Sequence, residues 1–163
     1  QVRKGAFDFL KCAELMPEVQ FVWAGGFSFG IISDGYKELT KVVENPPANV
    51  KFLGIVERED MNKVYNAADV MFLPSFDELF PMTVLEAMCV NIPVLLRELP
   101  IYENILFDFY ASEKDVEGFV RELERLRDVI HFPSEIMPLA MLRPISGSGS
   151  IAVATDIMKK AAF

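Results

Sequence analysis

The chain has 163 residues, of which 52% are hydrophobic, and it carries a formal net charge of −8. This size and composition predict a globular domain with a full core rather than a disordered chain. The acidic balance argues against nucleic-acid binding, which needs clustered Lys and Arg, and against a polybasic membrane-binding patch. No apolar run approaches the roughly 20 residues needed to cross a bilayer.

The predicted elements alternate between helices and strands. In chain order, the pattern predicts a helix at about residues 6–16, a strand at 19–24, a helix at 35–44, a strand at 50–53, a helix at 59–67, a strand at 69–73, a helix after Pro81, a strand at 92–96, a short helix at 100–105 and a charged amphipathic helix at 115–128. This alternation predicts right-handed βαβ units and a Rossmann-like, doubly wound parallel sheet.

The last 30 or so residues are harder to place. They contain three prolines and a Gly-Ser stretch, and an apolar segment begins at Ile151. We find no sheet pattern there and expect a terminal helix. The sequence therefore predicts an α/β domain at residues 1–130 and a helical carboxyl-terminal extension at residues 131–163, to which no function is assigned.

Cysteine and histidine usage limits the kinds of catalytic centre. Cys12 and Cys89 fall on apolar helical stretches without CxxC spacing, so we interpret both as ordinary buried thiols. His131, the single histidine, stands beside Phe and Pro and is interpreted as structural or exposed. A histidine-based triad or a zinc site cannot be built within this chain.

One stretch has a spacing that suggests chemistry. The buried strand at 69–73 is followed by a short loop that carries Glu78, and then by a helix that carries Glu86. Glu86 lies about five residues, roughly 7 to 8 Å, along the helix, so both carboxylates could face one ligand at the carboxyl ends of the strands. Alternatively, the two are a solvated loop acid and an exposed helix acid.

Two further features of the sequence point to an anionic ligand. The helix start is expected to offer free backbone N–H groups at Met82, Thr83 and Val84, which suit an anion such as a diphosphate. The glycine loop at residues 25–30 could let the backbone approach a phosphate or sugar, although it could equally be a plain flexible turn.

The segment E-L-F-P-M-T-V-L-E-A-M, at residues 78–88, resembles the E-x7-E motif of the retaining family 4 glycosyltransferases, also called group 1. Arg3-Lys4-Gly5 resembles that family's R-K-G signature, and the stretches VQFVWAGG and NVKFLGIVEREDMNKVYNAADVMFLPS resemble further family segments in the right order. The resemblance covers most of residues 2–128 and implies one half of the two-domain GT-B fold. A narrower similarity, to bacterial glycosyltransferases that build glycolipids such as diglycosyl-diacylglycerol, is found in the segments NPPANVKF and PVLLRELPIYENILFD.

The resemblance implies roles for the two carboxylates and the basic residues. Glu86 would bind the ribose hydroxyls of a nucleotide sugar, and Glu78 would contact the donor sugar near the reacting carbon. Lys4 would neutralise the donor diphosphate. Arg3 is counted with it, although the family's partner arginine usually stands several residues earlier, before residue 1.

The backbone is implied in the rest of the donor site. The amides of Met82, Thr83 and Val84 would hold the diphosphate, and the turn Gly54, Ile55 and Val56 would lie beside the nucleobase. Phe80 and Pro81 replace the smaller residues or glycines that are common after the first Glu. Because Pro81 has no N–H, at least one backbone donor is lost.

The implied activity is hexose transfer from a UDP-sugar to an acceptor hydroxyl with retention of configuration, through Lys4 and Glu78 as the catalytic residues. No D-x-D pair occurs, so neither a metal nor a cofactor beyond the nucleotide-sugar donor is expected. The chain is interpreted as an excised fragment whose missing amino-terminal domain holds the acceptor and makes any peripheral membrane contact. The alternative is a catalytically silent nucleotide-sugar-binding or interaction module, and a third interpretation is a GT-B-like sugar-nucleotide epimerase.

Overall fold

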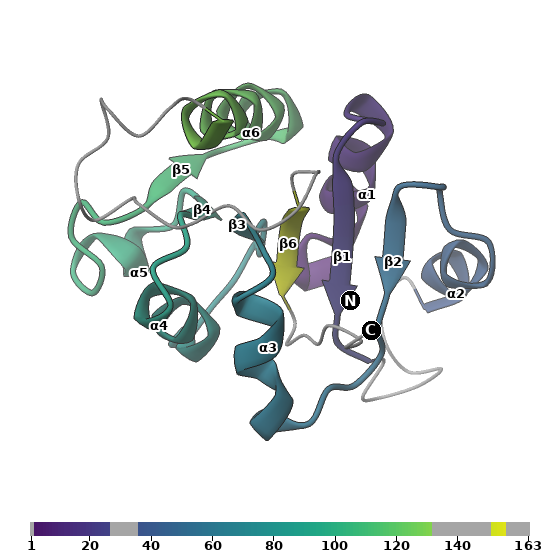
Figure 1. Ribbon diagram of the computed structural model, residues 1–163, viewed down its shortest axis with the longest axis horizontal. Coiled ribbons are helices and arrows are strands. Elements are labelled where there is room, and N and C mark those ends of the chain that lie inside the picture. Colours follow the sequence, from purple (N-terminus) through teal and green to yellow (C-terminus); the bar gives the residue numbers. More distant parts are fainter. Residues whose placement is uncertain (1, 27–35, 132–150, 156–163) are drawn as a thin grey trace.

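A single parallel sheet organises the residues that the computed structural model describes, which are 2–26, 36–131 and 151–155. Its strand order is β2-β1-β6-β3-β4-β5 (Figure 1). The strands are β1 (Gln20–Ala24), β2 (Val50–Phe52), β3 (Val70–Leu73), β4 (Val94–Arg97), β5 (Ala111–Glu113) and β6 (Ile151–Thr155). All the pairings are parallel, which confirms the predicted doubly wound sheet.

The helices follow the predicted alternation. They are α1 (Ala6–Leu15), α2 (Tyr36–Glu44), α3 (Met61–Tyr65), α4 (Met82–Cys89), α5 (Pro100–Glu103) and α6 (Val116–His131), with 3-10 turns η1 (Val2–Lys4) and η3 (Arg58–Asp60). Each predicted helix up to α6 is present, although α3 is shorter than expected because its first turn is the 3-10 turn η3. The short edge strand β5 was not predicted.

The central strand, β6, comes from the far end of the chain. It pairs with β1, where Gln20 lies opposite Ile151, and with β3, where Val70 lies opposite Ala152. Among the described residues no direct pairing joins β1 to β3, so β6 connects the two halves of the sheet.

The prediction of a helix that starts at Ile151 is therefore wrong for residues 151–155, which form β6. The sequence IAVAT has β-branched residues at every second position, which favours a strand, and the exposed ladder edges of β1 and β3 supply backbone partners. The rest of the predicted extension after His131 lies outside the described residues.

Two apolar clusters cover the two faces of the sheet. Along β3, Val70 and Phe72 point into the cluster that holds α1 and α6, whereas Met71 and Leu73 point into the cluster that holds α3 and α4. This alternation explains why β3 is an unbroken apolar run, since a strand buried on both faces has no polar side. Aromatic rings fill the first cluster, and the Phe72 and Phe119 centroids lie 4.9 Å apart.

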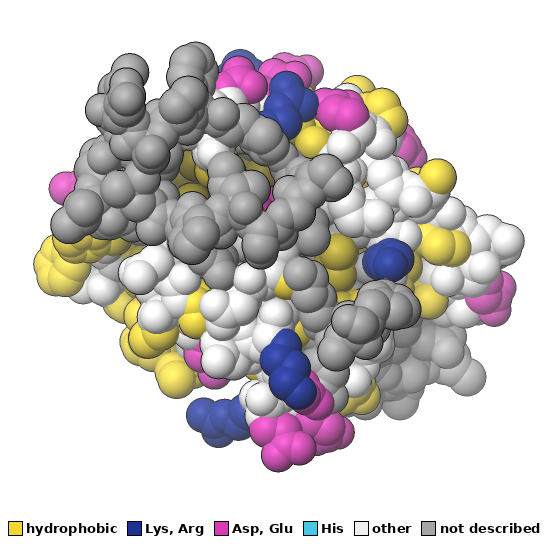
Figure 2. Space-filling model, viewed as in Figure 1, with side chains coloured by type: hydrophobic (Ala, Val, Ile, Leu, Met, Phe, Trp, Pro, Cys, Tyr) yellow, Lys and Arg dark blue, Asp and Glu magenta, His cyan; other side chains and the backbone are white. Residues whose placement is uncertain are grey.

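The surface positions bear on two sequence predictions. Cys12 is fully buried, as predicted, but the prediction is wrong for Cys89, which is exposed as the last residue of α4. On the face in Figure 2, Lys and Arg side chains are scattered among acidic ones rather than gathered in one patch. Among the described helices, none has both the length and the apolar character that crossing a bilayer requires.

Candidate functional site

The amino-terminal segment meets the end of β3 through Gly5. This residue has a positive φ of 74°, and a Cβ atom in its place would lie 2.2 Å from the carbonyl oxygen of Pro74. Only glycine tolerates both the left-handed conformation and so close a backbone approach. The glycine of the R-K-G segment thus brings η1 and the start of α1 against the loop that follows β3.

Lys4 and Glu78 form an ion pair across this junction. The Lys4 Nζ donates to Glu78 Oε1 at 2.9 Å, and the two side chains are only 15% and 8% exposed. The backbone holds the same two segments together, because the N–H of Phe76 donates to the carbonyl of Arg3 at 2.8 Å. The structure therefore brings together two residues that are 74 positions apart in the sequence and that the resemblance assigns to one donor site.

Arg3 lies at the same junction but is more exposed. Its Nη1 donates to the carbonyl oxygen of Asp77 at 2.7 Å and lies 3.9 Å from the Asp77 carboxylate, while its side chain is 50% exposed. An exposed ion pair of this length contributes little to stability. Arg3 helps to attach η1 to the loop, and its charge remains at the surface beside the Lys4–Glu78 pair.

Glu86 is held by a residue that the sequence analysis missed. The phenol of Tyr65, at the end of α3, donates to Glu86 Oε2 at 3.0 Å. Burial and the charge of Glu86 raise the pKa of Tyr65, so this phenol stays protonated and remains a donor. The signal in the sequence was weak, because a tyrosine on an apolar helix face usually indicates only core packing.

The start of α4 differs from the prediction. The N–H of Met82 donates to the carbonyl of Phe80 at 3.0 Å, and that of Val84 donates to the carbonyl of Pro81 at 2.9 Å. The expectation that these two N–H groups are free was wrong, because the chain curls into tight turns that satisfy them. The Phe80 and Met82 side chains are each half-exposed, Thr83 is partly exposed, and Val84 is buried.

The predicted nucleobase turn lies at the ends of β1 and β2. Gly54 has a φ of 69° with open space around it, and its carbonyl accepts a hydrogen bond from the Gly25 N–H at 2.9 Å. Ile55 is exposed and Val56 is buried. In the strand order, β1 and β6 separate this turn from β3. The glycine loop beyond Gly26 lies outside the described residues.

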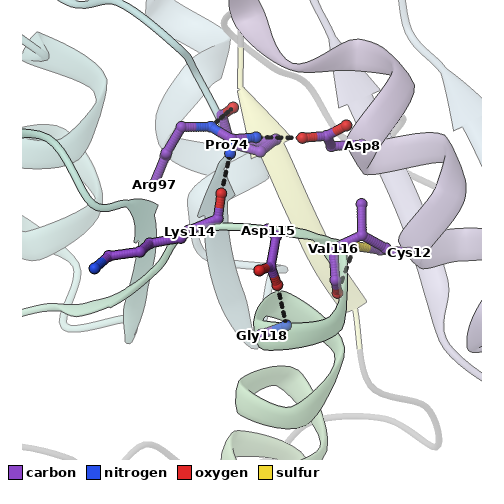
Figure 3. A network of polar contacts seen from close by, with 8 residues as sticks. All are labelled: Asp8, Cys12, Pro74, Arg97, Lys114, Asp115, Val116 and Gly118. Atoms are coloured by element: carbon purple, nitrogen blue, oxygen red, sulfur yellow. Dashed lines mark hydrogen bonds and ion pairs between the residues drawn. The ribbon is translucent and has the colours of Figure 1, made fainter.

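A second charged residue at this edge, Arg97, was also missed. It ends β4, is 7% exposed, and donates from Nε to the carbonyl oxygen of Pro74 at 3.0 Å. Its terminal nitrogens donate to the carbonyl of Lys114 and to the carboxylate of Asp8, as Figure 3 shows. The guanidinium carbon also lies 3.8 Å from the centroid of the Phe76 ring. The available sequence signal was the arginine at the end of the apolar run VLLR. An arginine at the end of a buried strand needs several hydrogen-bond partners, and this indicates a polar cluster there.

Two buried hydroxyls complete the surroundings of the site. Ser75 Oγ and Tyr102 OH have no hydrogen-bond partner among the residues that the structure describes. Burial, together with the charge of Glu78, raises the pKa of Tyr102. Within the same described residues, no group of three or more His, Cys, Asp or Glu side chains is placed to hold a metal ion.

Comparisons with known proteins identify the family of the chain. The family described as "Glycosyl transferases group 1" matches residues 2–128. The chain is 51% identical over 112 residues to alpha-galactosylglucosyldiacylglycerol synthase of Streptococcus pneumoniae, a match that covers 69% of this chain and 30% of that protein. It is 34% identical over 105 residues to processive diacylglycerol alpha-glucosyltransferase of Acholeplasma laidlawii, covering 64% of this chain and 31% of that protein.

A solved structure supports the fold. Sucrose-phosphate synthase of Thermosynechococcus elongatus superposes with a TM-score of 0.68 at 21% identity, over 78% of this chain and 34% of that one. The chain thus spans about a third of the length of each of these relatives. From these matches and from the parallel sheet, the chain belongs to the group 1 glycosyltransferases and has the α/β fold of one half of a GT-B enzyme.

Proposed function

We propose that this chain is the donor-binding part of a retaining glycosyltransferase that transfers a hexose from a UDP-hexose to an acceptor hydroxyl. The observation that supports the proposal best is the Lys4–Glu78 pair, whose atoms lie 2.9 Å apart at the carboxyl edge of a parallel sheet. Ligands of open parallel sheets bind at this edge. A charged sugar donor that binds at this edge would meet both a cation and a carboxylate.

Lys4 is proposed to neutralise the donor diphosphate. Its side chain is only 15% exposed, and a charge that is shielded from water acts more strongly on a neighbouring anion. When the bond between the sugar and the diphosphate breaks, negative charge grows on the leaving phosphate oxygen, and a cation that is already in place stabilises that charge without reorganisation. Glu78 would hold the donor sugar so that the acceptor oxygen bonds to the same carbon on the same face.

The nucleoside is proposed to lie between α4 and the turn at residues 54–56. Glu86 accepts hydrogen bonds from the ribose hydroxyls, because an ionised carboxylate is an acceptor that suits two neighbouring O–H donors. Backbone groups of the turn at residues 54–56 would read the base. Because the N–H groups of Met82 and Val84 already have partners, more of the diphosphate binding falls on Lys4.

The acceptor is proposed to be a glycolipid. Both sequence relatives above carry diacylglycerol in their names, and the more similar one is 51% identical to this chain. In the whole protein, a second, amino-terminal domain would hold the acceptor across the cleft and make any peripheral contact with the membrane. The donor is the substrate, and no separate cofactor is proposed.

Calorimetric titration of the chain with UDP, UDP-glucose, UDP-galactose and GDP-mannose tests the proposal. We expect uridine-selective binding that Lys4→Ala and Glu86→Ala each weaken about tenfold, the effect of losing one charge-assisted hydrogen bond. The matched control is Lys11→Ala, since Lys11 is an exposed lysine of α1 that pairs only with its neighbour Glu14 among the contacts described. Binding that is indifferent to both site variants would place the site elsewhere.

An activity assay separates the enzyme from a silent binding module. The whole protein is supplied with UDP-hexose and a diacylglycerol-based acceptor, and the anomeric configuration of the product is determined by NMR. Transfer with retention supports the proposed enzyme. Tight donor binding without turnover would instead favour a catalytically silent module.

A further inference from the structure

We propose that Tyr65 is a positioning residue that fixes the Glu86 carboxylate for the ribose hydroxyls and so makes the site selective for ribonucleotides over deoxyribonucleotides. This inference rests on the proposed function, because it assumes that Glu86 meets the ribose. It adds a residue outside the E-x7-E segment, contributed by a different helix.

The geometry of the contact is that of a fixed donor. Tyr65 is 2% exposed and belongs to the apolar cluster that includes Val64, Val84 and Ala87, so its ring is held by packing from both α3 and α4. Its hydroxyl donates to Glu86 Oε2 at 3.0 Å. Within the described part of the chain, this is the one hydrogen bond that the Glu86 side chain makes.

A glutamate without such a contact would have to be ordered when the nucleotide binds. Its side chain has several rotatable bonds, and fixing a long side chain of this kind costs about 1.5 kcal/mol or more. The Tyr65 phenol removes part of this cost before the ligand arrives, as a supporting hydrogen bond does for a preorganised binding residue. Oε1 and the second lone pair of Oε2 then remain as acceptors for hydroxyl donors.

A second tyrosine offers a matched control. Tyr102 is also fully buried in the same apolar cluster, but its hydroxyl has no hydrogen-bond partner among the described residues. Replacing either tyrosine by phenylalanine removes one buried hydroxyl and keeps the ring. The two variants therefore differ in whether a hydrogen bond to a site carboxylate is lost.

The test is calorimetric titration of the chain and its variants with UDP and with 2′-deoxy-UDP. We expect Tyr65→Phe to weaken UDP binding by up to about tenfold, because the Glu86 side chain must then be ordered on binding, and to weaken 2′-deoxy-UDP binding much less. The preference for UDP thus falls, whereas Tyr102→Phe keeps it. Thermal melting of both variants checks that they fold.

The outcomes are distinguishable. Equal weakening of both nucleotides by Tyr65→Phe would indicate a purely structural tyrosine and would overturn the inference, while the proposed donor site would stand if Glu86→Ala lowers the preference for UDP. An unchanged preference for UDP in Glu86→Ala would overturn the inference together with the assignment of Glu86.

If Tyr65→Phe does not fold, Glu86→Asp provides a second test, because the shorter side chain moves the carboxylate away from the Tyr65 phenol. A full preference for UDP in that variant would also overturn the inference.

Discussion

Two charged contacts attach the amino-terminal segment to the carboxyl edge of the sheet, and they are built differently. Arg97 donates to two backbone carbonyls and to Asp8, and it stacks on an aromatic ring, a set of contacts that we call the Arg97 cluster. The Lys4–Glu78 pair is instead a contact between two side chains. Backbone partners cannot leave without unfolding the loop, whereas a side-chain partner can be exchanged for a ligand anion. We therefore expect the Arg97 cluster to hold the frame of the site, and the proposed ligand binding to depend on the Lys4–Glu78 pair.

The largest effect is expected from Arg97→Met. The substitution leaves the Asp8 carboxylate, which is only 25% exposed, without its cation, and it leaves two loop carbonyls without their donor. Breaking a buried ion pair in this way costs about 3 to 5 kcal/mol. Urea unfolding followed by circular dichroism measures the loss. A cost below about 1 kcal/mol would mean that the loop does not depend on the Arg97 cluster.

Gly5→Ala is expected to break both contacts at once, because Gly5 lies between them. We expect a loss of about 2 to 4 kcal/mol, from left-handed strain and from the clash with the carbonyl of Pro74. The matched control is Gly54→Ala, which has a similar φ but no atom within 4 Å of the added Cβ. That variant should lose only about 1 to 2 kcal/mol. Equal losses in urea unfolding would show that the backbone approach at Pro74 is not tight.

Lys4→Met is expected to separate binding from stability. We expect it to cost about 2 to 3 kcal/mol of unfolding free energy, because the Glu78 carboxylate, which is only 8% exposed, loses its cation. The cost should stay below that of Arg97→Met, which also leaves two loop carbonyls without their donor. Its effect on UDP affinity should match the tenfold loss expected for Lys4→Ala. Parallel urea unfolding and calorimetry measure the two quantities. If Lys4→Met instead costs as much stability as Arg97→Met, the two contacts have the same structural role.

The parts of the fold that could be predicted are those that depend on local sequence. The strands β1 to β4 and most helices follow from local patterns, such as the unbroken apolar run of β3 and the proline break before β2. The strand β6 could not be predicted, because its partners Gln20 and Val70 are more than 80 residues away in the sequence. A short apolar segment of this kind also suits a helix. It forms a strand here because β1 and β3 both offer it backbone hydrogen-bond partners.

Within the candidate site, Glu78 and Glu86 stand out by their spacing in one segment, and the family resemblance links Lys4 to them. Tyr65 and Arg97 were missed, because their partners lie on other elements and the local sequence does not show those contacts. The free N–H groups expected at the start of α4 illustrate the opposite error. The rule for helix ends is general, but at Met82 and Val84 the preceding carbonyls of Phe80 and Pro81 were available as partners.

The effect that is smallest near neutral pH is an alkaline one, at Cys12 beside the Arg97 cluster. Burial and the neighbouring Asp8 raise the pKa of this thiol to about 12, against the opposing charge of Arg97. Because the folded pKa exceeds the unfolded one, the thiol's contribution to stability is fully present below pH 9.0 and is lost as the pH rises towards 12. In a Cys89→Ala background, which leaves one thiol, unfolding free energies at pH 8 to 11 should fall more steeply than with Cys12→Ala added, by up to about 1.4 kcal/mol per pH unit. Parallel slopes would mean that water reaches the thiolate, and that this side of the Arg97 cluster is open to solvent.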